Sequence, residues 1–97
     1  MNDNNKSNSV AKKTLIIQNK LGLHARAASQ FVQLTNKFKA DITISRGRQE
    51  VNGKSIMGVM MLAAAKGSKI TVTASGEDAN SALDAIEKLV NDKFGEE

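Results

Sequence analysis

Residues 14–38 read TLIIQNKLGLHARAASQFVQLTNKF, and they decide the fold because a strand, a turn and a helix follow one another directly. The apolar run before Gln18 is typical of a largely buried strand, which we expect over residues 13–18. Residues 19–22 have the composition of a turn. The apolar side chains after the turn recur at helical spacing, at Ala27, Phe31, Leu34 and Phe38. This periodicity predicts an amphipathic helix of about 13 residues.

The remainder of the chain alternates between strand and helix patterns of similar size. Residues 41–51 predict a hairpin that turns at residues 46–48, and a short helix is expected from Ile56 to about Ala65. A strand over residues 70–74 and a last helix carrying Ala82, Leu83, Ile86, Leu89 and Val90 complete the order βαββαβα. Short crossovers in this order predict an α+β fold, in which three helices cover one face of a four-stranded antiparallel sheet.

Two polar residues stand where helices should begin. Ser55 precedes the short helix and Asp78 precedes the last one, and a side-chain oxygen at such a position can accept a hydrogen bond from the first turn. For Ser55, capping alone is a sufficient explanation. The acidic end at Glu96 and Glu97 is expected to be frayed.

Length and composition indicate one small domain. With 97 residues and no cysteine, we assign residues 1–10 to a polar, disordered N-terminal extension and residues 11–97 to a single domain. The N-terminus lacks the apolar region of a secretory signal, and no apolar stretch approaches the roughly 20 residues of a membrane span. We therefore expect a cytoplasmic protein without membrane insertion.

The net charge of +4 does not by itself indicate nucleic-acid binding. The basic residues are scattered along the chain, and three Phe with no Tyr or Trp provide no platform for stacking bases. A mildly positive surface suits an acidic protein partner equally well.

His24, the single histidine, follows Gly22 at the predicted start of the first helix. The first N–H groups of a helix lack partners and its dipole is positive there, so this position favours an anion. The same field disfavours a protonated imidazole and leaves a neutral nucleophile, whereas a phosphoryl group added to the ring would be stabilised. Arg26 could reach the phosphoryl oxygens with its guanidinium group.

Other interpretations of His24 stay open from the residues alone. A lone histidine near a turn is often only a polar surface residue. A metal site is not expected, because one histidine without cysteine or a nearby acidic cluster cannot supply the ligands. A hydrolytic triad would need a second base, and the chain has no other histidine.

The helix after Ser55 has more apolar side chains than one buried face requires. We expect Val59, Met61 and Leu62 to be buried and some of the others to be exposed, since flexible methionines suit surfaces that bind several partners.

Two segments resemble the signatures of the HPr family, the histidine phosphocarriers of the bacterial phosphoenolpyruvate-dependent phosphotransferase system. Residues 22–28 (GLHARAA) are similar to the family's active-site signature, and residues 51–60 (VNGKSIMGVM) resemble the one around its regulatory serine. The resemblance extends from about Lys12 to Phe94 and implies the family's open-faced β-sandwich. The family usually has proline after the arginine. Here that residue is Ala27, and we expect the helix and the transfer to persist.

This resemblance implies a carrier without a cofactor, and not an enzyme in its own right. His24 would accept a phosphoryl group on Nδ1 from phosphorylated Enzyme I and pass it to the A domain of a sugar permease or a related acceptor. Arg26 would stabilise the phosphoryl charge. Ser55 would be a target of a bifunctional HPr kinase/phosphorylase, and Ile56, Met57 and Met60 would form an exposed patch for partners.

Two alternatives accompany this interpretation. The chain could serve the nitrogen-related regulatory branch, which uses a paralogous carrier, although the segment around Ser55 favours the HPr type. It could also be a non-catalytic interaction module in which His24 has no chemical role. A monomer is expected for a carrier that docks several partners through one face.

Overall fold

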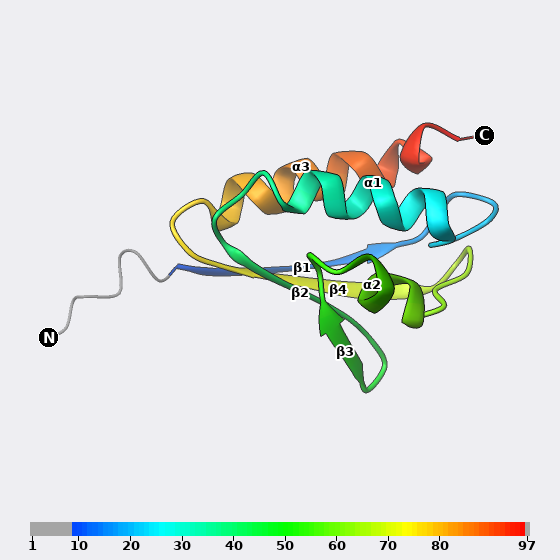
Figure 1. Cartoon of the computed structure of the whole chain (residues 1–97), viewed down its shortest axis with the longest axis horizontal. Coiled ribbons are helices and arrows are strands. Elements are labelled where there is room, and N and C mark those ends of the chain that lie inside the picture. The colour runs from blue at the N-terminus through cyan, green and yellow to red at the C-terminus, as the bar shows by residue number, and fades with distance from the viewer. Residues whose placement is uncertain (1–8, 97) are drawn as a thin grey trace, which may run out of the picture.

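The computed structural model describes residues 9–96 as a sheet with helices packed on one of its faces (Figure 1). The elements are β1 (Val10–Ile16), α1 (Ala25–Thr35), β2 (Asp41–Arg46), β3 (Gln49–Asn52), α2 (Ile56–Met61), β4 (Lys69–Ser75), α3 (Ala79–Asn91) and the 3₁₀ turn η2 (Lys93–Gly95). The predicted order βαββαβα and the open-faced sandwich are confirmed.

The four strands are arranged in the order β1-β4-β2-β3 with every neighbouring pair antiparallel. β4 is central, since Val72 lies opposite Lys13 of β1 on one side and Ile44 of β2 on the other. Alternate residues of β4 point toward the helices, and Ile70, Val72 and Ala74 are fully buried. Burying one large apolar side chain contributes about 1.5–3 kcal/mol, so this strand forms the floor of the core.

The core lies between the sheet and the apolar faces of α1 and α3. Phe31 of α1 and Ile86 and Val90 of α3 are fully buried, as the helical spacing predicted. In Figure 1 the two helices run side by side above the sheet, and the start of α1 lies at the same end as the C-terminus. This arrangement brings two segments distant in sequence to one end of the molecule.

The predicted N-terminal extension is too long by at least one residue. Val10 already belongs to β1 and lies opposite Ser75, and the carbonyl of Ser9 accepts a hydrogen bond from Gly76. Val10 follows a polar run and its side chain is exposed, so no pattern of burial indicated that the strand begins here. Pairing of the backbone needs no buried side chain. Residues 1–8 of the extension lie outside the described part of the chain.

The first helix is shorter than its periodicity predicted. α1 ends at Thr35, and the next turns tighten, with Lys37 donating to Leu34 and Phe38 donating to Thr35. The Thr35 hydroxyl donates to the carbonyl of Gly53 at 2.8 Å and fixes the helix end against the next turn. Phe38 packs against the core from outside the helix, which explains why its spacing suggested one more turn.

The second helix was also predicted too long, because it ends at Met61 and not near Ala65. Side chains of the β2–β3 hairpin bind its last carbonyls: Arg46 Nη1 donates to Leu62 and Gln49 Nε2 donates to Met61, each at 3.2 Å. Ala63 then adopts a positive φ of 50°, which turns the chain away from the helix axis. These hydrogen bonds come from a distant part of the chain.

Asp78 occupies the position before α3, but the prediction that its side chain caps this helix is wrong. Its carboxylate instead accepts hydrogen bonds from the backbone N–H groups of Lys39 and Ala40, both at 2.9 Å. These bonds lower the pKa of Asp78, that from Lys39 foremost. The residue therefore joins the start of α3 to the loop before β2.

Gly22 allows the turn before α1 to lie against the segment after α2. Its φ is +69°, and a Cβ atom added here would lie 2.4 Å from the carbonyl oxygen of Ala64 and 2.9 Å from Cα of Ala65. Both the left-handed backbone and the close approach exclude a side chain. The loop that holds His24 thus depends on this glycine.

We predict that Gly22→Ala destabilises the fold more than Gly47→Ala does. Gly47 also has a positive φ, +61°, but nothing lies within 4 Å of its added Cβ. The control should cost about 1 kcal/mol for the backbone alone, and Gly22→Ala at least about 1 kcal/mol more because backbone atoms must move. Urea unfolding of both variants measures the difference. Equal losses would contradict the close approach.

Candidate functional site

His24 is the N-cap residue of α1, and its backbone is extended, with φ −74° and ψ 178°. Its carbonyl accepts the first hydrogen bond of the helix, from Ala28 at 2.8 Å. The preceding residue, Leu23, is buried and donates to the carbonyl of Ala64 at 2.9 Å. Backbone hydrogen bonds just before and at His24 therefore hold this residue in place, while the His24 side chain stays 29% exposed.

The surroundings of His24 favour negative charge. The first turn of α1 contains no acidic residue, and its N–H groups before Ala28 have no carbonyl of the helix to bind. A shallow cavity of about 290 Å³ is lined by Lys20, Leu21, His24, Arg26 and Glu96. The structure thus brings together the two residues predicted for the site, His24 and Arg26, at a helix end suited to a phosphoryl group.

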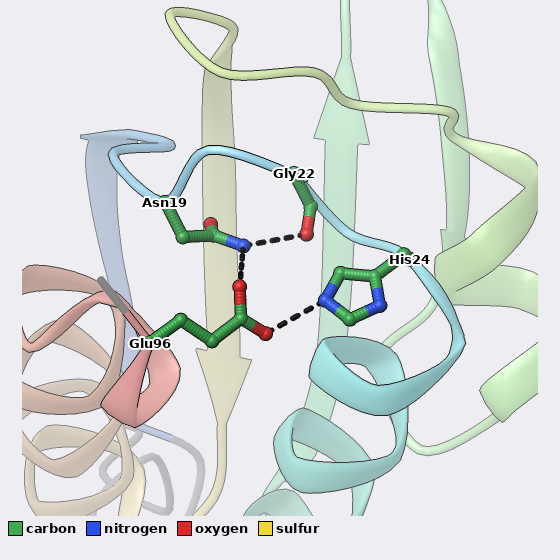
Figure 2. A network of polar contacts seen from close by, with 4 residues as sticks. All are labelled: Asn19, Gly22, His24 and Glu96. Carbon is green, nitrogen blue, oxygen red and sulfur yellow. Dashed lines mark hydrogen bonds and ion pairs between the residues drawn. The ribbon is translucent and has the colours of Figure 1, made fainter.

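Glu96 also belongs to this site, so the expectation that it is frayed is wrong. Its Oε2 lies 2.7 Å from Nε2 of His24, and Nδ2 of Asn19 donates to its Oε1 at 3.1 Å (Figure 2). The same nitrogen of Asn19 donates to the carbonyl of Gly22 at 2.8 Å. No sequence pattern pointed to the contact, because the two residues are 72 positions apart. The other half of the expectation, Glu97, lies outside the described residues.

A buried phenylalanine brings Glu96 to this position. Phe94 is 2% exposed and has a positive φ of 56°, within the short turn η2 that follows α3. The turn leaves the chain at the end of the molecule where α1 begins, as Figure 1 shows. Anchoring of Phe94 in the core therefore determines where the last described carboxylate lies.

The hydrogen bond from His24 lowers the pKa of Glu96, and the amide of Asn19 acts in the same direction. Partial burial opposes both, while the positive charge of Arg26 adds a smaller favourable effect. A carboxylate with a lowered pKa stabilises the folded state above its ordinary pKa, and this contribution is lost as the pH falls through the lowered value. Glu96 is accordingly ionised at neutral pH.

Ser55 caps α2, as predicted. Its Oγ accepts a hydrogen bond from the N–H of Gly58 at 3.0 Å, and its backbone is extended.

Ala27 stands where the family usually has proline, and it lies fully buried in the first turn of α1. The helix therefore forms without a proline at this position.

α2 exposes a group of apolar side chains, here called the α2 patch. It consists of Ile56, Met57, Met60 and Met61, which are 43%, 74%, 40% and 65% exposed. The exposure expected of the first three is confirmed, as is the burial of Val59 and Leu62. The prediction that Met61 is buried is wrong, because so short a helix turns few of its residues toward the core.

Residues 9–96 contain no group of three histidine, cysteine, aspartate or glutamate side chains placed to hold a metal ion. None of the helices described is long and apolar enough to cross a membrane.

The fold and the site define a small open-faced β-sandwich protein with an imidazole at a helix end that favours anions. A family model described as the PTS HPr component phosphorylation site matches residues 11–92. Phosphocarrier protein HPr of Neisseria meningitidis serogroup A is 48% identical over 85 residues, which cover 88% of this chain and 96% of that protein. Phosphocarrier protein NPr of Shewanella violacea is 45% identical over 85 residues, covering 88% and 93%.

Among solved structures, HPr-C-His from Thermoanaerobacter tengcongensis superimposes with a TM-score of 0.87 at 42% identity, covering 90% of this chain and 98% of that one. The chain belongs to the HPr family, the phosphocarrier proteins of the phosphotransferase system.

We predict that Ser55→Ala lowers the free energy of unfolding by about 1 kcal/mol, because the N–H of Gly58 loses its acceptor. Ser55→Asp should retain most of that stability, since a carboxylate at the N-cap accepts the same hydrogen bond. Thermal and urea unfolding of the two variants provide the comparison. An alanine variant as stable as the parent would show that the cap contributes nothing.

Proposed function

We propose that the chain carries a phosphoryl group on Nδ1 of His24. Phosphorylated Enzyme I, charged by phosphoenolpyruvate, would be the donor, and a histidine on the A domain of a sugar permease or a related acceptor would receive the group. The observation that carries this proposal is the partly exposed imidazole at the start of α1, in a member of the phosphocarrier family.

The transfer is a simple exchange of bonds. The Nδ1 lone pair forms a bond to phosphorus while the bond between phosphorus and Enzyme I breaks, and the electron pair of that bond stays on Enzyme I. In the second transfer the bond between Nδ1 and phosphorus breaks and its electron pair returns to Nδ1. The chain emerges unchanged and completes each step only in a complex with a partner, so it is a carrier and not an enzyme.

Arg26 supports the phosphoryl group in this proposal. It is exposed, lies in the first turn of α1 and lines the same cavity as His24. A guanidinium group presents several donors in a fixed geometry and binds phosphoryl oxygens well. Together with the free N–H groups of the first turn, Arg26 would stabilise the negative charge that arrives with the phosphate.

The α2 patch would be the docking surface for Enzyme I and the acceptor domains. The hydrogen bond between Leu23 and Ala64 ties the loop before His24 to the segment that follows α2. Ser55 begins the same helix, so phosphorylation by an HPr kinase/phosphorylase would place negative charge beside the patch without refolding the helix. The monomeric state and the cytoplasmic location expected from the sequence stay predictions.

Two branches of the phosphotransferase system are compatible with this chemistry. The relatives include phosphocarriers named HPr and one named NPr, at 48% and 45% identity. The segment around Ser55 favours the HPr type and hence the carbohydrate branch, with the nitrogen-related branch as the alternative. A non-catalytic interaction module is the remaining alternative, and it is the one that tolerates loss of His24.

We predict that the chain gains one acid-labile phosphate when incubated with phosphoenolpyruvate, Mg²⁺ and Enzyme I, and that His24→Ala gains none. Arg26→Ala should take up the phosphate more slowly, by about tenfold or more, because charge-assisted hydrogen bonds to the phosphoryl oxygens are lost. Intact mass, read over time and again after acid treatment, gives the extent, the rate and the lability.

An HPr of known activity, charged by the same Enzyme I, is the positive control. Failure of the wild-type chain while the control is charged would overturn the proposed function and favour the interaction module. Phosphate on His24→Ala would place the acceptor on another residue.

We predict that Met57→Glu slows phosphoryl uptake from Enzyme I, since it places charge on the most exposed side chain of the α2 patch. Val10→Glu is the matched control: Val10 is 66% exposed and is the first residue of β1, and Figure 1 shows this strand starting at the end of the sheet away from α2. Ser55→Asp should act in the same direction as Met57→Glu. Uptake at the parent rate in Met57→Glu would remove the docking role.

A further inference from the structure

The contact between His24 and Glu96 has a geometry that distinguishes the two ring nitrogens. Nε2 lies 2.7 Å from Oε2 of Glu96, while the other ring nitrogen points away from the carboxylate (Figure 2). An ionised carboxylate only accepts hydrogen bonds. The proton of a neutral imidazole is therefore favoured on Nε2, and the lone pair is left on Nδ1.

We propose that Glu96 is a positioning residue, whose carboxylate holds the ring proton of His24 on Nε2 and so presents Nδ1 as the nucleophile. The inference rests on the proposed function, because it concerns the same histidine. It adds a residue from the C-terminal segment, outside both signature segments, as the one that selects the reacting nitrogen.

Asn19 shows that the carboxylate is held in place. Its side chain is fully buried, and Nδ2 donates both to Oε1 of Glu96 and to the carbonyl of Gly22. The amide thus fixes Glu96 to the loop that leads into His24. Among the residues described, Oδ1 of Asn19 has no partner, so the amide orientation is determined by its two donated bonds.

The same contact suits the phosphorylated ring. When Nδ1 binds phosphorus and Nε2 keeps its proton, the ring carries positive charge, which the Glu96 carboxylate beside Nε2 stabilises. The phosphoryl oxygens would be bound by the N–H groups of the first turn of α1 and by Arg26, which lines the same cavity. The phosphoryl group would thus be paired with Arg26 and the helix end, and the Glu96 carboxylate with the positively charged ring. No proton leaves Nε2 in either transfer, so none has to be moved to or from solvent.

The test compares Glu96→Ala and Glu96→Gln with the parent chain and with Glu77→Ala. Glu77 is an exposed glutamate next to Asp78, away from the site, and its replacement should change nothing. Two readouts are needed: the rate of phosphoryl uptake from Enzyme I, and the ¹⁵N chemical shifts of the imidazole, which report which nitrogen carries the proton. A purely structural role would not change the second readout.

We expect the neutral ring of the parent to be protonated on Nε2. In Glu96→Ala this preference should weaken, and uptake should slow by about three- to tenfold, as for one partly exposed charge-assisted hydrogen bond. Glu96→Gln, whose amide oxygen accepts without charge, should lie between them. If Glu96→Ala keeps both the rate and the protonation of the parent, the positioning role is overturned and the carrier function stands. If the parent accepts no phosphate, the carrier function fails, and the inference with it.

Discussion

The packing of the loop before α1 against the segment after α2 is the constraint on which the site depends. The N–H of Leu23 donates to the carbonyl of Ala64, and Gly22 approaches the backbone of Ala64 and Ala65 more closely than any residue with a side chain could. One short contact therefore determines where α1 begins and joins the His24 loop to α2. The positions of His24 and of the α2 patch therefore both depend on this packing.

The charges around His24 complement this geometry. The positive end of α1 and Arg26 lie beside the imidazole, and the carboxylate of Glu96 contacts its Nε2. In the proposed cycle the phosphoryl group is bound at the helix end, and the ring acquires its positive charge beside the carboxylate. A phosphoryl group held this way is stabilised yet still exposed to a partner, as a carrier requires.

Sequence patterns predicted the elements well where local periodicity reports burial. The alternation of β4 and the apolar face of α3 predicted the core. His24 and Arg26 alone left other interpretations open, and the resemblance of residues 22–28 to the HPr signature singled them out as candidate site residues. The ends of α1 and α2 could not be predicted in this way. α2 ends where Arg46 and Gln49 bind its last carbonyls, and these side chains come from a separate hairpin. Asp78 likewise binds a distant loop instead of its own helix.

The position of Glu96 in the site could not be predicted from local sequence patterns either. An acidic pair at a chain end is typical of a frayed terminus, and only the burial of Phe94 in the folded core brings this carboxylate to Nε2. Met61 was misplaced for a related reason, since the number of buried residues in α2 depends on where the helix stops.

The phosphoryl group is predicted to be bound to Nδ1 of His24, while Nε2 faces Glu96. The most direct test is to label the histidine with ¹⁵N, phosphorylate the chain with Enzyme I and detect the coupling between phosphorus and nitrogen by NMR. Coupling to Nδ1, with a proton retained on Nε2, is the predicted result. Coupling to Nε2 would contradict the account, because it would require the phosphate to displace Glu96.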